Sequence, residues 1–436
     1  MNILAFYAYY DPEVVASGYL QNDIIEALSR CGDVNLHVPV PTRGITKDVR
    51  EKYNQLRSES QLDGKIKISR YSLYNEGKNP VLRALRYFIQ NIKQHHIAAK
   101  SRGADIMFCG STPPTQGFFL AHAKKVLSEK QGQNVPFIYN LQDIFPDSLA
   151  GTGLAKKGGL LWKIGRFVEN YTYKYADKII VIGESFKENI LAKGVPEEKI
   201  EVVYNWVDEN AVVPVAKEDN PLFDEFGISR DKFHVVYAGN LGNAQNIDVI
   251  IDAANVLKEE NNVEFVIFGT GGLKDQFVAK VNDLKLDNVK FFPLQPMERV
   301  SQVYGLGDVC VVSCKPGLGG AAMPSKMLSI MSAGRAVVAS FDKGELTYIL
   351  EKHKCGMYAP AGDAEAFAGL IKHLSQNRDE CKAMGDNARK LILQKFTKAY
   401  GTSRYVEIIK SVVSSRNPHD KRLSTDNTNL DNRLIK

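Results

Sequence analysis

The sequence predicts an α/β protein built from two parallel-sheet domains in tandem. Short apolar runs alternate with helix-like segments along its 436 residues. The apolar runs are continuous, as in strands that are buried on both faces. The whole pattern restarts after a polar, proline-containing stretch at residues 208–220. We therefore expect one Rossmann-like domain on each side of that stretch, with ligands outside the carboxyl ends of the strands and a central cleft between the two domains.

Each expected element follows from its local pattern. In the N-terminal domain, residues 1–207, apolar runs predict strands at 3–9, 34–40, 105–109, 136–141 and 178–182. Helical periodicity predicts helices at 18–31, 116–129 and 160–175. After the linker 208–220, the C-terminal domain, residues 221–395, has expected strands at 233–238, 264–268, 289–292, 309–313 and 335–339. Its expected helices are 247–259, 273–284 and 297–304.

The C-terminal end has two expected parts. Residues 396–414 are expected to form a helix that returns to the N-terminal domain. Residues 415–436 are rich in Asn, Asp, Ser and Arg and lack periodicity, which predicts a disordered tail.

Composition excludes several classes of protein. With 44% apolar and 24% charged residues, the chain is typical of a globular protein. It contains no apolar run of about 18 residues and no signal-peptide pattern at its start, so we expect a cytoplasmic protein. The six cysteines form no C-x-x-C pair, which argues against a zinc ribbon or a disulfide framework.

Positive charge is concentrated in one region. Residues 43–102 contain fourteen Lys and Arg against five Asp and Glu, a local balance of +9. Within it, residues 81–93 are amphipathic and carry no acid. This segment is either a helix packing its apolar face on the sheet or one lying in an anionic membrane surface. Nothing indicates a nucleic-acid partner.

Two glycine turns follow neighbouring strands. The first is Gly239-Asn240-Leu241-Gly242, and the second is 269–272, which contains Gly269 and Gly271. Such turns present bare backbone to a phosphate, or they are only tight turns that need glycine. Neither is a G-x-G-x-x-G fingerprint, so NAD is not favoured.

A lysine begins a later helix. Pro324-Ser325 predicts a helix start, with Ser325 as the cap and Lys326 in the first turn. A cation there opposes the positive end of the helix dipole. We interpret Lys326 as a diphosphate ligand, the alternative being an ordinary surface lysine.

These motifs, in this order, resemble those of the retaining glycosyltransferases of family 4, which have the GT-B fold. The resemblance covers nearly all of residues 1–415. It includes Gly18 in the first loop, the segment 142–147, and the stretches 182–196, 203–208, 238–242, 268–271 and 324–334. It is strongest with enzymes of bacterial surface polysaccharides, including L-fucosamine (N-acetylfucosamine) transferases of O-antigen clusters.

The chain departs from that family at several positions. The family's two glutamates, which hold the donor sugar and the ribose, correspond here to Ala321 and Ser329. The usual Arg and Lys after the first glycine turn correspond to Asn240 and Gln245, and a common first-domain histidine corresponds to Gln142. Glu345 either replaces the ribose contact or only caps its helix. The resemblance places Leu294 beside the base.

Asp143 follows an apolar strand and is either an acceptor-side catalytic residue or a turn-capping aspartate. No D-x-D motif occurs, so we expect no metal, and Lys326 would carry the leaving-group charge. Without an evident nucleophile, a retaining transfer relies on positioning and electrostatics.

The resulting prediction is a glycosyltransferase without cofactor. It would move a sugar from a nucleotide-sugar, a UDP-sugar above others, to a lipid-linked (polyprenyl diphosphate) saccharide in O-antigen or capsule synthesis. We place it in the cytoplasm, at the inner face of the membrane. The alternatives are a different GT-B enzyme, or a non-catalytic protein that binds sugar nucleotides.

Overall fold

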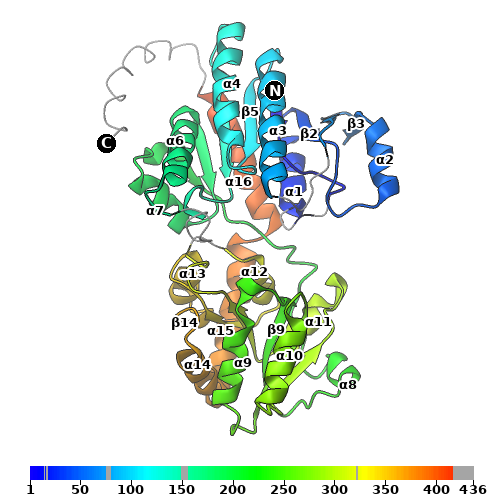
Figure 1. Cartoon of the computed structure of the whole chain (residues 1–436), viewed down its shortest axis with the longest axis vertical. Coiled ribbons are helices and arrows are strands. Elements are labelled where there is room, and N and C mark those ends of the chain that lie inside the picture. The colour runs from blue at the N-terminus through cyan, green and yellow to red at the C-terminus, as the bar shows by residue number, and fades with distance from the viewer. Residues whose placement is uncertain (14, 16–17, 75–79, 149–155, 321–322, 416–436) are drawn as a thin grey trace. The chain divides into compact units, whose positions relative to one another are not determined.

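The computed structural model describes residues 1–13, 15, 18–74, 80–148, 156–320 and 323–415. The chain forms two compact units, the first made of Met1–Tyr204 and Gly401–Lys436 and the second of Asn205–Tyr400 (Figure 1). Each contains a sheet that is parallel except at one edge of unit 1, with helices on both faces, which confirms the predicted pair of Rossmann-like α/β domains.

Unit 1 contains an eight-stranded sheet in the order β3-β4-β2-β1-β5-β6-β7-β8. Only the edge pair β3–β4 is antiparallel. The strands are β1 (Asn2–Phe6), β2 (Asp33–Pro39), β3 (Ser58–Gln61), β4 (Ile66–Tyr71), β5 (Ile106–Gly110), β6 (Phe137–Leu141), β7 (Lys178–Val181) and β8 (Ile200–Val202). The helices are α1 (Gly18–Leu28), α2 (Lys47–Gln55), α3 (Pro80–Lys100), α4 (Gln116–Gln131), α6 (Leu160–Tyr175) and α7 (Glu184–Ala192).

Unit 2 contains a six-stranded parallel sheet in the order β11-β10-β9-β12-β13-β14. Its strands are β9 (Phe233–Asn240), β10 (Val263–Thr270), β11 (Val289–Phe292), β12 (Val309–Ser313), β13 (Ala336–Ser340) and β14 (Gly356–Ala359). Its helices are α8 (Leu222–Glu225), α9 (Ile247–Val256), α10 (Lys274–Asp283), α11 (Val300–Gly305), α12 (Ser325–Ser332), α13 (Glu345–His353), α14 (Ala364–Gln376) and α15 (Arg378–Lys395).

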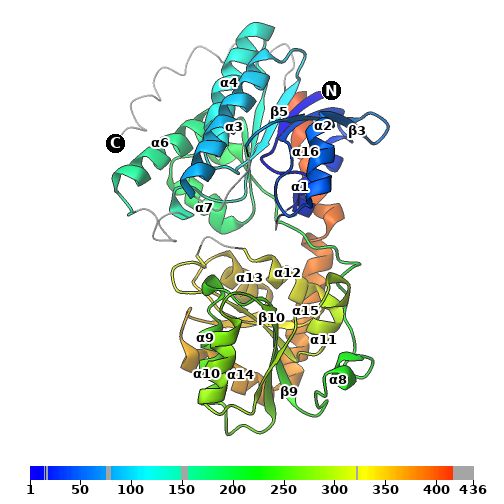
Figure 2. The same cartoon turned by 45° about the vertical axis from the view of Figure 1, so that its right-hand side comes forward.

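The covering helices of unit 2 bury apolar faces against this sheet. In Figure 2, α9 and α10 lie on one side of it, and α11 and α15 on the other. The core joins the inward residues of β9, β10, β12 and β13 to those of α9 and α14. This packing is what the continuous apolar runs of the sequence predict for strands buried on both faces.

The chain crosses between the units in two places. Residues 208–220, which the sequence predicts as a linker, belong to unit 2, where the Val213 N–H donates to Ser301 Oγ over 3.0 Å. The last helix, α16 (Lys398–Ser414), belongs to unit 1 from Gly401 onward, and its Tyr405 hydroxyl donates to Asn140 Oδ1 at 3.0 Å. The predicted tail comprises residues 415–436, and those from 416 onward lie outside the described residues.

Candidate functional site

The strand order of unit 2 contains a switch point. Counted from β9, the order is 3-2-1-4-5-6, so the connections leave β9 and β12 in opposite directions across the sheet. Ligands of such sheets bind outside the carboxyl ends of these strands. The two predicted glycine turns lie there side by side, because Gly239 pairs with Gly269 and Asn240 with Thr270.

Two glycines are required by the shape of these turns. Gly239 has a φ of 148° and Gly271 a φ of 158°, which side-chain-bearing residues rarely adopt. A Cβ on Gly271 would lie 2.5 Å from the Leu241 carbonyl oxygen, and one on Gly269 would lie 2.6 Å from Leu241 Cγ. The turns are therefore packed directly against each other.

The side chain and both backbone polar groups of Leu241 make contacts within the turn. Its side chain is fully buried, and its N–H already donates to the Thr270 carbonyl oxygen at 2.8 Å. Its own carbonyl accepts from the Leu273 N–H. The Leu241 N–H and carbonyl are therefore both bonded within the turn, and the prediction that Leu241 contributes to the donor site stays a prediction.

Lys326 reaches the first glycine turn from α12. Its Nζ lies 3.5 Å from the centroid of the Tyr237 ring, and a Cβ on Gly239 would lie 2.8 Å from it. No described residue pairs with its charge as a salt bridge or a hydrogen bond. Burial without a counter-ion lowers the pKa of Lys326 to about 7. An amine held this way is ready to receive an anion.

Sequence analysis does not identify Tyr237, the residue whose ring contacts the Lys326 amine. Its hydroxyl donates to the Asn240 carbonyl oxygen at 2.8 Å, and the residue is buried. A ring face under an ammonium is a stabilising contact. The continuous apolar run at residues 233–238 assigns Tyr237 to a strand, but it does not indicate what lies over its ring.

Ser325 is not the cap of α12. Pro324 occupies the N-cap position, and no side chain accepts a capping hydrogen bond there. Ser325 is instead the first helical residue and is exposed. Serine-capping is therefore a wrong prediction, although Lys326 does lie in the first turn.

The two positions where the family carries cations bond to each other here. Asn240 Nδ2 donates to Gln245 Oε1 at 3.3 Å. A lysine that the sequence missed, Lys315, follows β12 and bonds with Asn243 Oδ1, while its N–H donates to the Ala244 carbonyl oxygen at 3.0 Å. The loop after β12 is thereby tied to the loop after β9. Its position directly after an apolar strand is the signal that would have found Lys315.

Two further predicted residues lie at neighbouring loops. Glu345 is buried in the first turn of α13. The Gly344 before it packs on Gly320, since a Cβ there would lie 2.6 Å from the Gly320 carbonyl oxygen. Glu345 therefore lies beside the loop that leads from β12 to α12. Leu294 follows β11 and is 46% exposed.

Gly18 and Asp143 belong to the other unit. Gly18 begins α1, and Asp143 follows β6. Burial of its carboxyl group raises the pKa of Asp143, although hydrogen bonds from Ser148 and the Ile144 backbone oppose the shift. Both residues lie in unit 1, whereas the glycine turns lie in unit 2.

Of the two positions where the family carries glutamates, the structure describes only Ser329, which has no carboxylate. Ser329 lies on α12, and its hydroxyl turns back to the Ser325 carbonyl oxygen at 3.4 Å. Ala321 lies outside the described residues. In the described parts of the chain, no three His, Cys, Asp or Glu side chains cluster as metal ligands. None of the described helices is long and apolar enough to cross a membrane.

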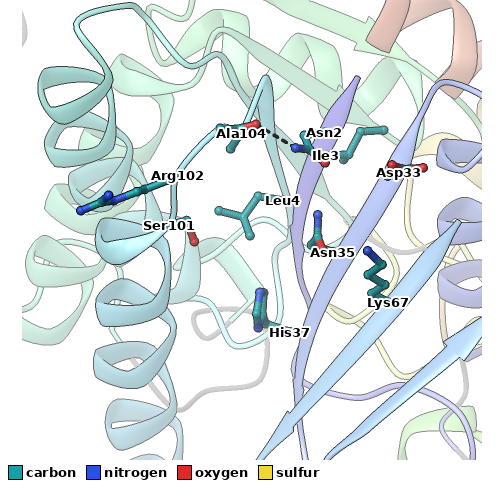
Figure 3. A pocket seen from close by; sticks show the side chains of 11 residues that line it. Asn2, Ile3, Leu4, Asp33, Asn35, His37, Lys67, Ser101, Arg102 and Ala104 are labelled. Carbon is teal, nitrogen blue, oxygen red and sulfur yellow. Dashed lines mark hydrogen bonds between the residues drawn. The ribbon is translucent and has the colours of Figure 1, made fainter. Parts of the chain in front are cut away.

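A separate pocket of about 370 Å³ opens in unit 1 (Figure 3). Its lining comes from the beginnings of β1 and β4, the length of β2 and the loop that follows α3, with Asn35, His37, Lys67 and Ser101 among its side chains. None of the predicted site residues lines it. It lies away from the carboxyl ends of the strands, where ligands of such sheets bind.

Comparisons with known proteins point to one enzyme class. Residues 41–211 match the family model Glycosyltransferase Family 4, and residues 219–391 match Glycosyl transferases group 1. The chain is 26% identical over 357 residues to WcaI of Escherichia coli (strain K12), named as a colanic acid biosynthesis glycosyl transferase, across 80% of this chain and 86% of WcaI. It is 23% identical over 319 residues to WbjE of Pseudomonas aeruginosa, named as a glycosyltransferase, across 73% of this chain and 77% of WbjE.

A solved structure shares the fold. Anabaena HepE in complex with UDP superposes with a TM-score of 0.66 at 17% identity, over 94% of this chain and all of HepE. The resemblance in both units, and the two sheets described above, lead to one assignment: the chain is a glycosyltransferase with the GT-B fold, built from a family 4 domain and a group 1 domain.

Proposed function

We propose that this enzyme transfers a sugar from a nucleotide-sugar to a lipid-linked saccharide during the synthesis of a bacterial surface polysaccharide. The observation that carries the proposal is Lys326, a cation with no acidic partner among the described residues, held over Tyr237 at the switch point of unit 2. Buried cations are normally paired, so an unpaired one against bare glycine backbone indicates an absent anion. The diphosphate of the donor is that anion.

Two relatives support the finer assignments. HepE has been solved with UDP and with UDP-glucose, which favours a UDP-sugar of the hexosyl or N-acetylhexosaminyl type, N-acetylfucosamine included. The colanic acid assignment of WcaI favours polysaccharide synthesis, where a polyprenyl diphosphate would carry the acceptor, at the cytoplasmic face of the membrane.

The proposed reaction needs positioned charge rather than a protein nucleophile. The acceptor hydroxyl oxygen bonds to the anomeric carbon as the bond from that carbon to the diphosphate breaks, with retention. The diphosphate leaves with the electron pair and takes the hydroxyl proton. Lys326 moves onto the departing diphosphate, and Lys315 supplies a second positive charge from the loop after β12.

The other predicted residues have roles in this scheme. Gly239, Gly269 and Gly271 let the backbone approach the diphosphate, with Asn240 and Ser325 beside it. Leu294 faces the base and Glu345 the ribose. In unit 1, Gly18 and Asp143 act on the acceptor side, where the raised pKa of Asp143 suits a proton-handling carboxyl.

A panel of nucleotide-sugars tests the proposal. Thermal unfolding with UDP-, GDP-, dTDP- and ADP-sugars should show the largest rise in Tm with a UDP-sugar, since a ligand that binds only the native state stabilises it. Turnover with a polyprenyl-linked acceptor then separates an enzyme from a binding protein. Tight binding with no transfer and no slow donor hydrolysis would favour the non-catalytic alternative, which the missing carboxylate at Ser329 supports.

Metal dependence is a second test. The scheme neutralises the diphosphate with lysines, so transfer should continue at an unchanged rate in excess EDTA. Loss of turnover on chelation, with recovery on adding Mn²⁺ or Mg²⁺, would contradict it.

A further inference from the structure

Helix α3 is turned with its polar face inward. The polar side chains that it buries against unit 1 are Arg86, Gln90, Asn91 and Gln94, each at most 1% exposed, and the only other buried side chains among its described residues are Ala98 and Ala99 near its end. The opposite face carries five apolar side chains that are 46–73% exposed: Val81, Leu82, Leu85, Phe88 and Ile92. A surface helix ordinarily does the reverse. The sequence-based alternative in which residues 81–93 pack their apolar face on the sheet is therefore wrong.

Hydrogen bonds fix this orientation. Gln94 Nε2 donates to the Tyr7 carbonyl oxygen at 3.1 Å, and Asn91 Nδ2 donates to Thr115 Oγ1 at 2.6 Å. Arg86 donates to the Tyr74 carbonyl oxygen. Rotating the helix to bury its apolar face would break all of these bonds and leave their partners unpaired. The outward apolar face is thus a property of the fold.

Helix α6 shows the same inversion. Leu160, Leu161, Ile164 and Phe167 are 51–78% exposed, at the spacing of one helical face. The opposite face buries Glu169, whose carboxylate accepts from Lys193 Nζ at 2.7 Å and from the Tyr173 hydroxyl at 2.9 Å.

Aromatic rings on α4 join the two exposed faces. Figure 1 shows α4 between α3 and α6, and α4 packs on both. The ring centroids of Phe88 on α3 and Phe119 on α4 are 5.8 Å apart, those of Phe119 and Phe118 5.6 Å, and those of Phe118 and Phe167 on α6 6.0 Å. The exposed apolar residues of α3 and α6, with these rings, therefore form one continuous surface, here termed the α3–α6 surface.

The charges of this surface select its partner. Helix α3 contains Arg83 and Lys93 and no acid, and α6 contains exposed Lys163, while its single acid, Glu169, is buried and paired. A second copy docking through the same surface would bring like charges together, because a two-fold contact is self-complementary. Anionic phospholipid instead offers acyl chains to the apolar residues and phosphates to the cations.

We propose that the α3–α6 surface inserts into the headgroup layer of an anionic membrane. The proposal deepens the proposed function, in which the acceptor is lipid-linked, because it places unit 1 on the layer that holds that acceptor. Binding itself requires no donor and no turnover, so the two can fail separately.

Sedimentation of the full chain with vesicles tests the proposal. Wild type should bind vesicles of phosphatidylglycerol and phosphatidylethanolamine, and bind pure phosphatidylcholine at least tenfold more weakly. Phe88→Glu with Ile164→Glu should lower binding at least tenfold while retaining the wild-type Tm and UDP affinity. The matched control is Met297→Glu with Leu393→Glu, since these residues of unit 2 are 76% and 52% exposed. It should bind like wild type.

Tryptophan fluorescence gives a second readout on the unmodified chain. The chain has two tryptophans, Trp162 on α6 and Trp206, which is 1% exposed in unit 2. Brominated lipid should quench the Trp162 emission and leave that of Trp206. Three outcomes would each overturn the proposal. They are no vesicle binding by wild type, equal binding by wild type and the α3–α6 variant, and a wild-type dimer that this variant converts to monomer. UDP binding lost with vesicle binding retained would instead count against the proposed function alone.

Discussion

The two units share a strand order but treat the end of their first strand differently. In unit 1, the order from β1 is also 3-2-1-4-5-6, with β8 and β3 added at the edges. There the Phe6 and Tyr7 carbonyl oxygens accept from Gln116 and Gln94, and the Tyr7 ring packs on Gly110 at the end of β5. In unit 2, the end of β9 instead carries Gly239 beneath an unpaired Lys326.

Under the proposed function, this difference indicates that a switch point can bind a diphosphate only when the protein leaves it open. Side-chain amides satisfy the end of β1 and stabilise unit 1. The end of β9 keeps a buried amine whose charge is disfavoured, as its lowered pKa indicates. Unit 2 therefore gives up stability at the place where a diphosphate would recover it.

Removing Lys326 should have the largest effect. Lys326→Ala should lower kcat by about a hundred- to a thousandfold, or roughly 3–4 kcal/mol in the transition state, because the contact strengthens as the leaving group gains charge. Lys326→Arg should recover only part, since a planar fork cannot occupy the position of an ammonium. Steady-state kinetics measure both.

The control for this substitution is Lys258→Ala, an exposed lysine of the same unit. It should leave kcat unchanged. Near-wild-type kcat/KM in Lys326→Ala with a verified donor would mean that the phosphate site lies elsewhere.

A methyl group on Gly239 should be the next largest perturbation. Its Cβ would occupy the space of Lys326 Nζ, at 2.8 Å, so Gly239→Ala should weaken UDP binding roughly tenfold or more, which is about 1.4 kcal/mol. The matched control is Gly272→Ala, where a Cβ meets no atom within 4 Å. Calorimetric titration with UDP compares the two, and equal affinities would count against the contact.

Removing a hydrogen-bond donor from the end of β1 should lower the unfolding free energy and leave UDP binding unchanged. Gln116→Leu leaves the buried Phe6 carbonyl without its donor, which should cost about 1–2 kcal/mol of unfolding free energy. UDP affinity should stay at the wild-type value, because this amide belongs to unit 1. Urea unfolding and UDP titration of one variant give both values. A weaker UDP affinity in Gln116→Leu would contradict the assignment of UDP binding to the switch point of unit 2 alone.

The sequence predicts this architecture well because strand burial is a local signal. Continuous apolar runs locate the central strands. The polar strands β3 and β4 and the short strands β8 and β14 are not predicted, because they lack such runs. The glycine turns and Lys326 are also readable, since glycine and a misplaced first-turn cation are local anomalies. The role of Tyr237 is not, because it depends on a contact with Lys326, which lies far along the chain.

The α3–α6 surface shows the same limit more sharply. Periodicity identifies which residues of α3 share a face. It does not indicate which face turns outward, because the hydrogen-bond partners of the buried Gln94 and Asn91 are Tyr7 and Thr115, which lie far from them along the chain.

Replacing Lys326 by an apolar residue should give the smallest effect, a gain in stability. Its pKa is about 7 in the folded chain and 10.5 in the unfolded one, so between those values the unfolded chain binds more protons here. Lys326→Met should therefore raise the unfolding free energy. The full gain is expected below pH 7, and it should vanish as the pH rises toward 10.5. A gain of about 1 kcal/mol would raise Tm by roughly 2–4 °C. A destabilised variant at pH 7 would contradict this.

Proton uptake on UDP binding tests the central claim, that the unpaired Lys326 receives the diphosphate, most directly. Titration calorimetry at pH 8 in buffers of different ionisation enthalpy measures it, with Lys326→Arg as the reference because its guanidinium stays charged. Free Lys326 is largely neutral at pH 8 and must gain a proton to meet the diphosphate. The account predicts uptake of nearly one proton more by wild type than by Lys326→Arg, and a wild-type affinity that falls as pH rises above 7. Equal proton uptake and equal pH dependence in the two proteins would contradict it.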